Sequence, residues 1–371
     1  MELLLLWVVV GIEALVTATL FIILPRIARR GLLFGVYVGE VRWESDEARR
    51  ITRGWYAGMV LGLVAGAALA FAVALVYPGS PAGPFVSLFA LVALYPFLYL
   101  RAHLQARRMA EPGAPDVMAA PLVPETPASL EWPAFAIVVG VVGGGLAIGH
   151  AALNYEALPA RVPTHFGFSG APDAWSPRSF WTVLLLPIGT LIMGVSLGVV
   201  AALTARAKRA IRRQDKGVSV EAQMRFRSAM TRFLSGVAIL TTVMMALLSV
   251  GAVEVALGRA ERLPPLFMAL TGVLLVYALG GSLYLALRYG QGGARLERRA
   301  EAAPLTDGLA DNRRWVLGLF YVNRDDPSIF VEKRFGLGYT INFGNPRAIA
   351  LLLVFLALIA AFTVAGVVSS R

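Results

Sequence analysis

Eight apolar runs, each long enough for a helix to cross a lipid bilayer, dominate this sequence. A membrane-spanning helix needs about 20 predominantly apolar residues. Only 15% of the residues are charged, against about 25% in a typical soluble domain. We therefore expect an all-α polytopic membrane protein of about eight helices. The predicted spans are 3–25, 55–77, 84–104, 133–153, 181–204, 233–257, 264–287 and 349–369.

Lysine and arginine crowd into every second polar segment between these runs. Of the 34 such residues, 29 lie in residues 26–54, 101–132, 205–232 and 288–348, and five lie on the other side. Cytoplasmic loops of membrane proteins carry an excess of Lys and Arg. We therefore predict that both termini lie outside, and that the first run is a retained span and not a cleaved signal peptide. The net charge of +11 then needs no nucleic-acid partner.

Changes in composition divide the chain into five predicted segments. Apolar and aromatic runs split by turn residues also predict a small cytoplasmic β-rich module of two or three short strands at 315–346. The segments are a three-helix membrane segment at 1–132, a membrane domain at 133–204 with an extracytoplasmic loop at 154–180, a basic cytoplasmic loop with the sixth and seventh helices at 205–288, a cytoplasmic segment at 289–348 and the last helix at 349–371.

Small residues recur at helical spacing inside several spans. Gly54, Gly58, Gly62 and Gly66 are each four residues apart and share one face of the second span. Such a face lets another helix backbone approach closely. The pairs Gly140/Gly144 and Gly194/Gly198 repeat the pattern. We interpret these glycines as packing positions without a chemical role.

The extracytoplasmic loop carries the sharpest functional signal. It is too rich in Pro and Gly for a helix, and its backbone polar groups must be satisfied within it, which predicts an ordered cap. His165 can hydrogen-bond Asp173 across a turn at Gly170. That pair could lock the loop, recognise a ligand, or take part in metal or acid–base chemistry. The candidate ligand-binding residues are Arg161, His165, Phe166, Gly170, Pro172, Asp173 and Trp175.

Other ionisable residues lie in or near the spans. Glu13 lies near the middle of the first span, where an ionised carboxylate is costly and marks a candidate functional position. Zinc suits two histidines and a carboxylate, but no His-Glu-x-x-His pattern is present. Weak metal candidates near the outer ends of the spans are His150, Glu156, His165, Asp173 and Glu254.

No sequence motif indicates a cofactor or a familiar catalytic centre. The chain has no Walker loop, no dinucleotide-binding glycine turn and no Gly-x-Ser-x-Gly nucleophile elbow. We therefore expect no cofactor and favour a protein that is not an enzyme.

The outer loop also resembles a known family. Pro163-Thr164-His165-Phe166, followed by Gly170-x-Pro172-Asp173-x-Trp175 between two spans, resembles the signature of a bacterial membrane domain of unknown function. That domain is found at the N-terminus of the SdpI-like family, which is named for the immunity protein against the sporulation-delay toxin. The segment from Arg30 to Val38 resembles the cytoplasmic entry segment of larger relatives, and 315–346 resembles a small C-terminal domain that accompanies them.

This resemblance implies a function at the bacterial cytoplasmic membrane. It implies protection against a secreted antimicrobial protein and sequestration of a cognate repressor. The expected partners are membrane lipid, an extracellular peptide and a cytoplasmic regulator. Two alternatives stay open: a small-solute or ion transporter or channel, whose flux would depend on Glu13, and a metal-dependent membrane hydrolase.

Overall fold

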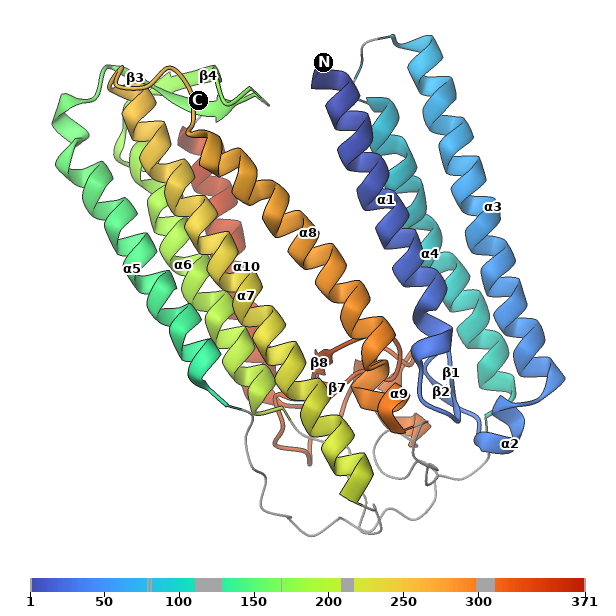
Figure 1. The fold of residues 1–371 in the computed structure, drawn as a ribbon. Helices are drawn as coiled ribbons and strands as arrows, with labels where there is room; N and C mark the ends of the chain where they lie inside the picture. The colour runs from blue at the N-terminus through green and yellow to red at the C-terminus, as the bar shows by residue number, and fades with distance from the viewer. Residues whose placement is uncertain are drawn as a thin grey trace. The chain divides into compact units, whose positions relative to one another are not determined.

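The computed structural model describes residues 2–78, 80, 82–110, 129–167, 169–207, 217–297 and 311–369. Within these residues, seven helices are long and apolar enough to cross a membrane, and each covers a predicted span (Figure 1). The all-α polytopic class is thus confirmed. Helix α10 (Pro346–Ser369) occupies the eighth predicted span, with a shorter apolar stretch at Pro346–Ala361. The seven are α1 (Glu2–Ile27), α3 (Asp46–Val76), α4 (Ala82–Arg108), α5 (Glu131–Leu153), α6 (Phe180–Ala205), α7 (Gly217–Ala256) and α8 (Pro265–Arg288).

Some helices begin well before the apolar run that predicts them. Helix α3 starts at Asp46 because the Ser45 side chain accepts a hydrogen bond from the Ala48 N–H, and acidic residues occupy the first turn. Both ends of the polar segment 26–54 are therefore helical. The proline-rich stretch at 111–128 and residues 208–216 of the basic segment 205–232 fall outside the described residues.

The chain forms two compact units, each assembled from segments distant in sequence. The first unit contains Met1–Thr126, Ala207–Phe226 and Ser282–Ala348. The second unit contains Pro127–Arg206, Arg227–Gly281 and Ile349–Arg371. Helices α7 and α8 each supply residues to both units.

An aromatic cluster forms the core of the first unit. A hairpin of β1 (Leu32–Leu33) and β2 (Val36–Tyr37) follows α1, and its turn residue Phe34 is buried. The Phe34 ring lies 5.3 Å from that of Trp55 on α3 and 5.5 Å from that of Phe335. Positive φ at Phe34 (43°) and at Gly35 (76°) makes the two-residue turn that tight hairpins favour. The hairpin thus buries an aromatic side chain at its tip.

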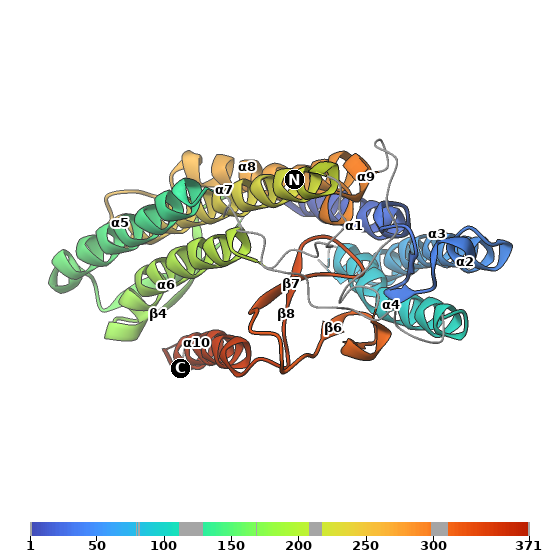
Figure 2. The same cartoon turned by 90° about the horizontal axis from the view of Figure 1, so that it is seen from below.

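The predicted β-rich module at 315–346 is confirmed, with four short strands. β5 (Trp315–Val316) pairs with β6 (Phe320–Tyr321), and β7 (Phe330–Glu332) pairs with β8 (Tyr339–Ile341), both antiparallel. Figure 2 shows β6, β7 and β8 of this module next to one another. The first unit also contains the short helices α2 (Glu40–Trp43) and α9 (Ala294–Glu297) and the 3-10 helices η2 (Gln291–Gly293) and η3 (Asn312–Arg314).

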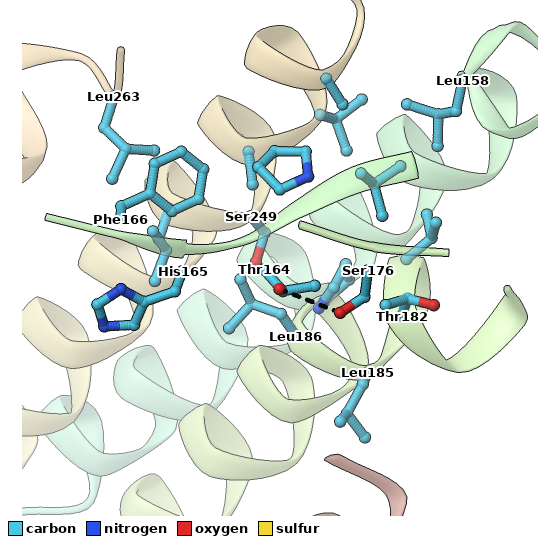
Figure 3. Close-up of a pocket in the computed structure, with 18 of the residues that line it drawn as sticks. Leu158, Thr164, His165, Phe166, Ser176, Thr182, Leu185, Leu186, Ser249 and Leu263 are labelled. Atoms are coloured by element: carbon cyan, nitrogen blue, oxygen red, sulfur yellow. Dashed lines mark hydrogen bonds between the residues drawn. The ribbon is translucent and has the colours of Figure 1, made fainter. Parts of the chain in front are cut away.

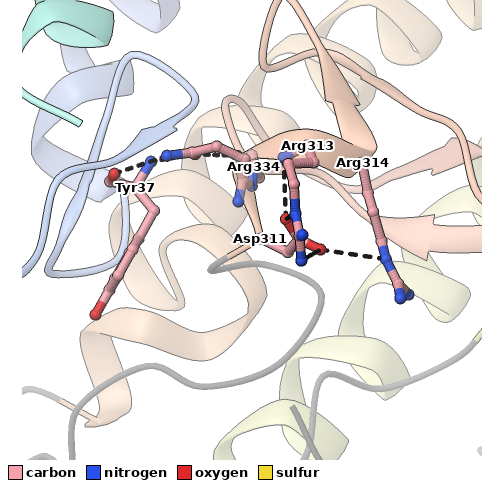
Figure 4. Close-up of polar contacts among 6 residues, drawn as sticks. Tyr37, Asp311, Arg313, Arg314 and Arg334 are labelled. Carbon is pink, nitrogen blue, oxygen red and sulfur yellow. Dashed lines mark hydrogen bonds and ion pairs between the residues drawn. The ribbon is translucent and has the colours of Figure 1, made fainter. Parts of the chain in front are cut away.

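Polar side chains in this module and just before it attach it to the β1–β2 hairpin (Figure 4). Asn312 accepts a hydrogen bond from the Tyr37 N–H (2.9 Å) and donates to the Tyr37 carbonyl (3.0 Å). The buried Arg334 donates to Asn312 Oδ1 (2.8 Å) and to the Gly35 carbonyl (3.2 Å), and its guanidinium lies over the Trp315 ring. Burial lowers the pKa of Arg334 to about 9, so this side chain stays charged at neutral pH. The hydrogen bonds of Arg334 therefore hold the module against the hairpin, while its contact with the Trp315 ring lies within the module.

Close helix packing through glycine is confirmed for α5 and α6 in the second unit. A Cβ atom on Gly140 would lie 2.7 Å from the Gly194 carbonyl carbon, so the two backbones touch. In α3 the prediction of backbone contact is wrong, because Gly58 and Gly62 face the side chains of Leu98 and Leu94 on α4. The larger α4 side chains fill the space that the glycines leave.

Candidate functional site

The segment expected to form an ordered cap is a β-hairpin. β3 (Arg161–Phe166) pairs antiparallel with β4 (Pro172–Pro177), with an irregular register between Pro163 and Phe166. Gly170, at φ 77°, allows the reversal between the strands. Figure 1 shows the hairpin at one end of the second unit, over the ends of α6 and α7. The loop is therefore an ordered cap, as expected, and its backbone polar groups are paired across two strands.

His165 and Asp173 form the expected hydrogen-bonded pair. Nδ1 of His165 lies 2.5 Å from Oδ1 of Asp173 on the facing strand. The two side chains are 70% and 51% exposed, so solvent can reach both. A contact between two side chains this exposed contributes only about 0 to 1 kcal/mol to stability. The pair fixes the imidazole orientation at the surface more than it stabilises the fold.

Two anchors hold the hairpin on the helices. The Gly170 carbonyl accepts a hydrogen bond from the Leu263 N–H (2.8 Å), just before α8. At the other end, Nη1 of Arg178 lies 3.1 Å, 3.2 Å and 2.8 Å from three carbonyl oxygens, those of Tyr155, Glu156 and Leu158. These carbonyls belong to the short helix η1 (Tyr155–Ala157) and the residue that follows it. The hairpin is thereby tied at its turn and at its base.

A cavity of about 530 Å³ lies beneath the hairpin (Figure 3). Its volume falls in the range of small-molecule sites, about 300 to 1,000 Å³. The walls are mostly apolar and come from β3, α6, α7 and α8. The hydroxyls of Thr164 and Ser176 lie 3.3 Å apart on this wall, and the Ser249 side chain adds another. The arrangement suits a ligand with an apolar body and few hydrogen-bonding groups.

The structure separates the seven predicted ligand-binding residues into two groups. His165 and Phe166 line the cavity. The other five lie in the hairpin but outside the cavity lining, where Arg161 donates to the Trp175 carbonyl (2.8 Å) and supports the strand pairing. These five are Arg161, Gly170, Pro172, Asp173 and Trp175.

Sequence reasoning missed the helical walls of the cavity. Ser249 on α7 and Phe267 on α8 both line it, although they lie far from the hairpin in sequence. One signal was present: Ser235, Thr242 and Ser249 recur every seven residues in an apolar span. All three are buried, and each hydroxyl donates to the carbonyl four residues earlier.

The five weak metal candidates do not come together in one group. Nε2 of His150 lies 2.9 Å from Oε1 of Glu254, and Nη1 of Arg259 lies 3.3 Å from the same oxygen. His165 and Asp173 form a separate pair, and the Glu156 carbonyl contacts Arg178. Among the described residues, no group of three or more such side chains could hold a metal ion. The carboxylate of Glu254 is instead engaged by two basic side chains.

Glu13 lies in α1, but its side chain falls outside the described residues. Its predicted role in the membrane therefore stays a prediction.

Two segments of the chain match known protein families. Residues 143–191 match a domain of unknown function (DUF1648), and this match covers the end of α5, the whole β3–β4 hairpin and the first part of α6. Residues 324–349 match a family of unknown function (DUF5808), which covers β7, β8 and the start of α10. No curated protein and no solved structure matches the chain. Both matched segments were singled out by the sequence pattern.

Proposed function

We propose that this chain is a non-enzymatic protein of the bacterial cytoplasmic membrane, of the SdpI-like kind, that acts in antimicrobial-peptide immunity or envelope sensing. The observation that carries this proposal is the mostly apolar cavity that the β3–β4 hairpin lines. Its ligand would be an amphipathic peptide, or the membrane lipid that such a peptide attacks. The match of 143–191 to a domain of unknown function supports the hairpin as a recurring element without giving its role.

The composition of the cavity indicates how such a ligand would be held. Apolar walls such as Leu185 and Phe267 would receive aliphatic or aromatic groups, which favour removal from water. The hydroxyls of Thr164 and Ser176 would orient a polar group at the hairpin. The exposed His165–Asp173 pair lies on the same strands and offers a hydrogen-bonding rim.

To act as a sensor, the protein must also change its structure when the ligand binds. Ser249 on the cavity wall belongs to α7, a continuous helix that begins at Gly217. A ligand that binds one arrangement of this helix better than another shifts the population toward it. We propose that the basic segment 205–232 and the module 315–346 present the result to a cytoplasmic regulator such as a repressor.

Survival under peptide challenge tests this proposal. Wild type, His165→Ala and Glu13→Gln are expressed at equal membrane levels in a sensitive host, which is then exposed to pore-forming peptides. We expect wild type to protect, His165→Ala to protect less, and Glu13→Gln to match wild type. Loss of protection in Glu13→Gln alone would favour transport instead. No protection by wild type, with no recruitment of a regulator to the membrane, would remove immunity as the function.

A further inference from the structure

A second cavity lies in the first unit, where α3 begins and α4 ends. It has a volume of about 350 Å³. Its floor is formed by buried residues of both helices, among them Ile51, Trp55, Leu98 and Ala102. Its rim is polar and carries Arg50, Arg101, Arg108, Gln105 and Glu47. The two helices thus enclose a hollow with an apolar floor and a basic rim.

The rim carries an excess of positive charge. Three arginines face one carboxylate, that of Glu47, which leaves a formal charge of +2. Arg50, Arg101 and Arg108 are all exposed, and none forms an ion pair with another described side chain. Arg49, next to Arg50, instead lies 3.6 Å from Asp46. Like charges that line one cavity repel each other, so an anion between them would lower the free energy of the arrangement.

The floor of the cavity continues along apolar helix surface. A Cβ atom on Gly54 would meet no atom within 4 Å, so the missing side chain contributes to the hollow. Farther along the same helices, Leu61 on α3 and Phe97 on α4 are 69% and 64% exposed. A ligand with a compact anionic head and long apolar chains would match the rim and this surface together.

We propose that this cavity binds the phosphate headgroup of an anionic phospholipid, with the acyl chains along the exposed apolar surface of α3 and α4. Arginine forms paired hydrogen bonds with phosphate oxygens more readily than lysine does. Basic pockets between membrane helices are known binding sites for anionic lipid headgroups. The site lies in a different unit from the β3–β4 cavity and is independent of the function proposed for it.

Native mass spectrometry of the full chain in detergent tests this proposal. The probes are phosphatidylglycerol, phosphatidylcholine with the same acyl chains, and glycerol 3-phosphate as the headgroup alone. We expect phosphatidylglycerol to bind at least about tenfold more tightly than phosphatidylcholine, a difference of about 1.4 kcal/mol. Equal binding of the two lipids would overturn the proposal. Binding of glycerol 3-phosphate as tight as that of the lipid would assign the site to a soluble phosphate.

Two matched sets of substitutions distinguish lipid binding in the cavity from a general attraction to the positive charge of the protein. Arg50→Gln, Arg101→Gln and Arg108→Gln together remove the rim charges, and we expect about a tenfold loss of phosphatidylglycerol affinity. The control combines Arg49→Gln, Arg53→Gln and Arg107→Gln, which change the net charge equally but do not line the cavity. Equal losses in both sets would overturn the site.

Filling the hollow provides a test that leaves the charge unchanged. Gly54→Leu should place a side chain in the cavity and weaken phosphatidylglycerol binding. Gly145→Leu on α5 is the control, because its Cβ also meets no atom within 4 Å. Unchanged binding in Gly54→Leu would contradict the proposal.

Discussion

Arg29 and Glu332 lie 303 residues apart in sequence, yet Nη2 of Arg29 is 3.2 Å from Oε2 of Glu332. The two side chains are only 5% and 6% exposed. The same Nη2 donates to the Gly292 carbonyl at 3.1 Å. This contact joins the end of α1, the segment after α8 and strand β7, so it holds the first unit together from three distant parts of the chain.

Breaking this buried pair on one side should destabilise the first unit strongly. Glu332→Leu leaves the Arg29 charge buried without its carboxylate, which typically costs about 3 to 5 kcal/mol. The double variant Arg29→Met with Glu332→Leu removes both charges and should be less destabilised than Glu332→Leu alone. Denaturant unfolding of the purified protein in detergent measures both. A double variant that is less stable than Glu332→Leu would contradict this reasoning.

The glycine contact between α5 and α6 predicts a position-specific cost. Gly140→Ala places a Cβ atom 2.7 Å from the backbone of Gly194 and should lower the free energy of unfolding by about 1 to 3 kcal/mol. Gly145→Ala, on the same helix with no atom within 4 Å, should be neutral or stabilise by about 0.5 to 1 kcal/mol. Thermal unfolding compares the pair. Equal effects would mean that backbone contact at Gly140 does not limit the packing.

Asp311 predicts an acid-sensitive component of stability (Figure 4). Its buried carboxylate accepts hydrogen bonds from the N–H and Nε of Arg313, each at 3.0 Å. Burial alone would raise the pKa of Asp311, but the Arg313 hydrogen bonds and the charges of Arg313 and Arg314 outweigh it, and the pKa falls below its usual range.

A lowered pKa in the folded state fixes the sign of the pH effect. The folded state binds this proton less readily than the unfolded state, so the stabilisation is complete above the ordinary aspartate pKa of about 3.9. It is lost as the pH falls from there through the folded-state pKa. Asp311→Asn should remove this component and leave a flatter stability profile between about pH 5 and 2. Asp325→Asn, at an exposed position in the 315–346 module, is the control and should retain the wild-type slope.

The predicted orientation in the membrane can be tested directly, because the chain contains no cysteine. Single cysteines are placed at the exposed positions Ser169 in the hairpin and Asp325 in the C-terminal module. The charge distribution predicts that a membrane-impermeant maleimide labels Ser169→Cys in intact cells. Asp325→Cys should react only after the cells are permeabilised. The reverse pattern would contradict the orientation with both termini outside.

The membrane helices were predictable because their signal is local. Length and apolar character place all seven spans, although α3 begins at Asp46, before the span predicted at 55–77. The strands were less visible: β3 and β4 contain Pro163, Pro172 and Pro177, which argue against strands in sequence reasoning. Strands of two residues such as β1 are too short to show an alternating pattern.

The candidate site was likewise predictable only where its contacts are local in the sequence. The His165–Asp173 pair spans eight residues across one turn, so its spacing suggested the contact. The wall at Ser249 depends on how α7 packs against the hairpin, and nothing local to either segment specifies that packing. The contact between Arg29 and Glu332 could not be predicted either, because only the tertiary fold brings these two residues together.

Filling the cavity beneath the hairpin tests the central claim most directly. Ala252 lines the cavity from α7, so Ala252→Leu should occupy ligand space without altering the exposed His165–Asp173 pair. Gly149→Leu on α5, where a Cβ meets no atom within 4 Å, is the matched control. At equal membrane expression, we predict that Ala252→Leu loses protection against pore-forming peptides while Gly149→Leu keeps it. Full protection by Ala252→Leu would contradict ligand binding in this cavity.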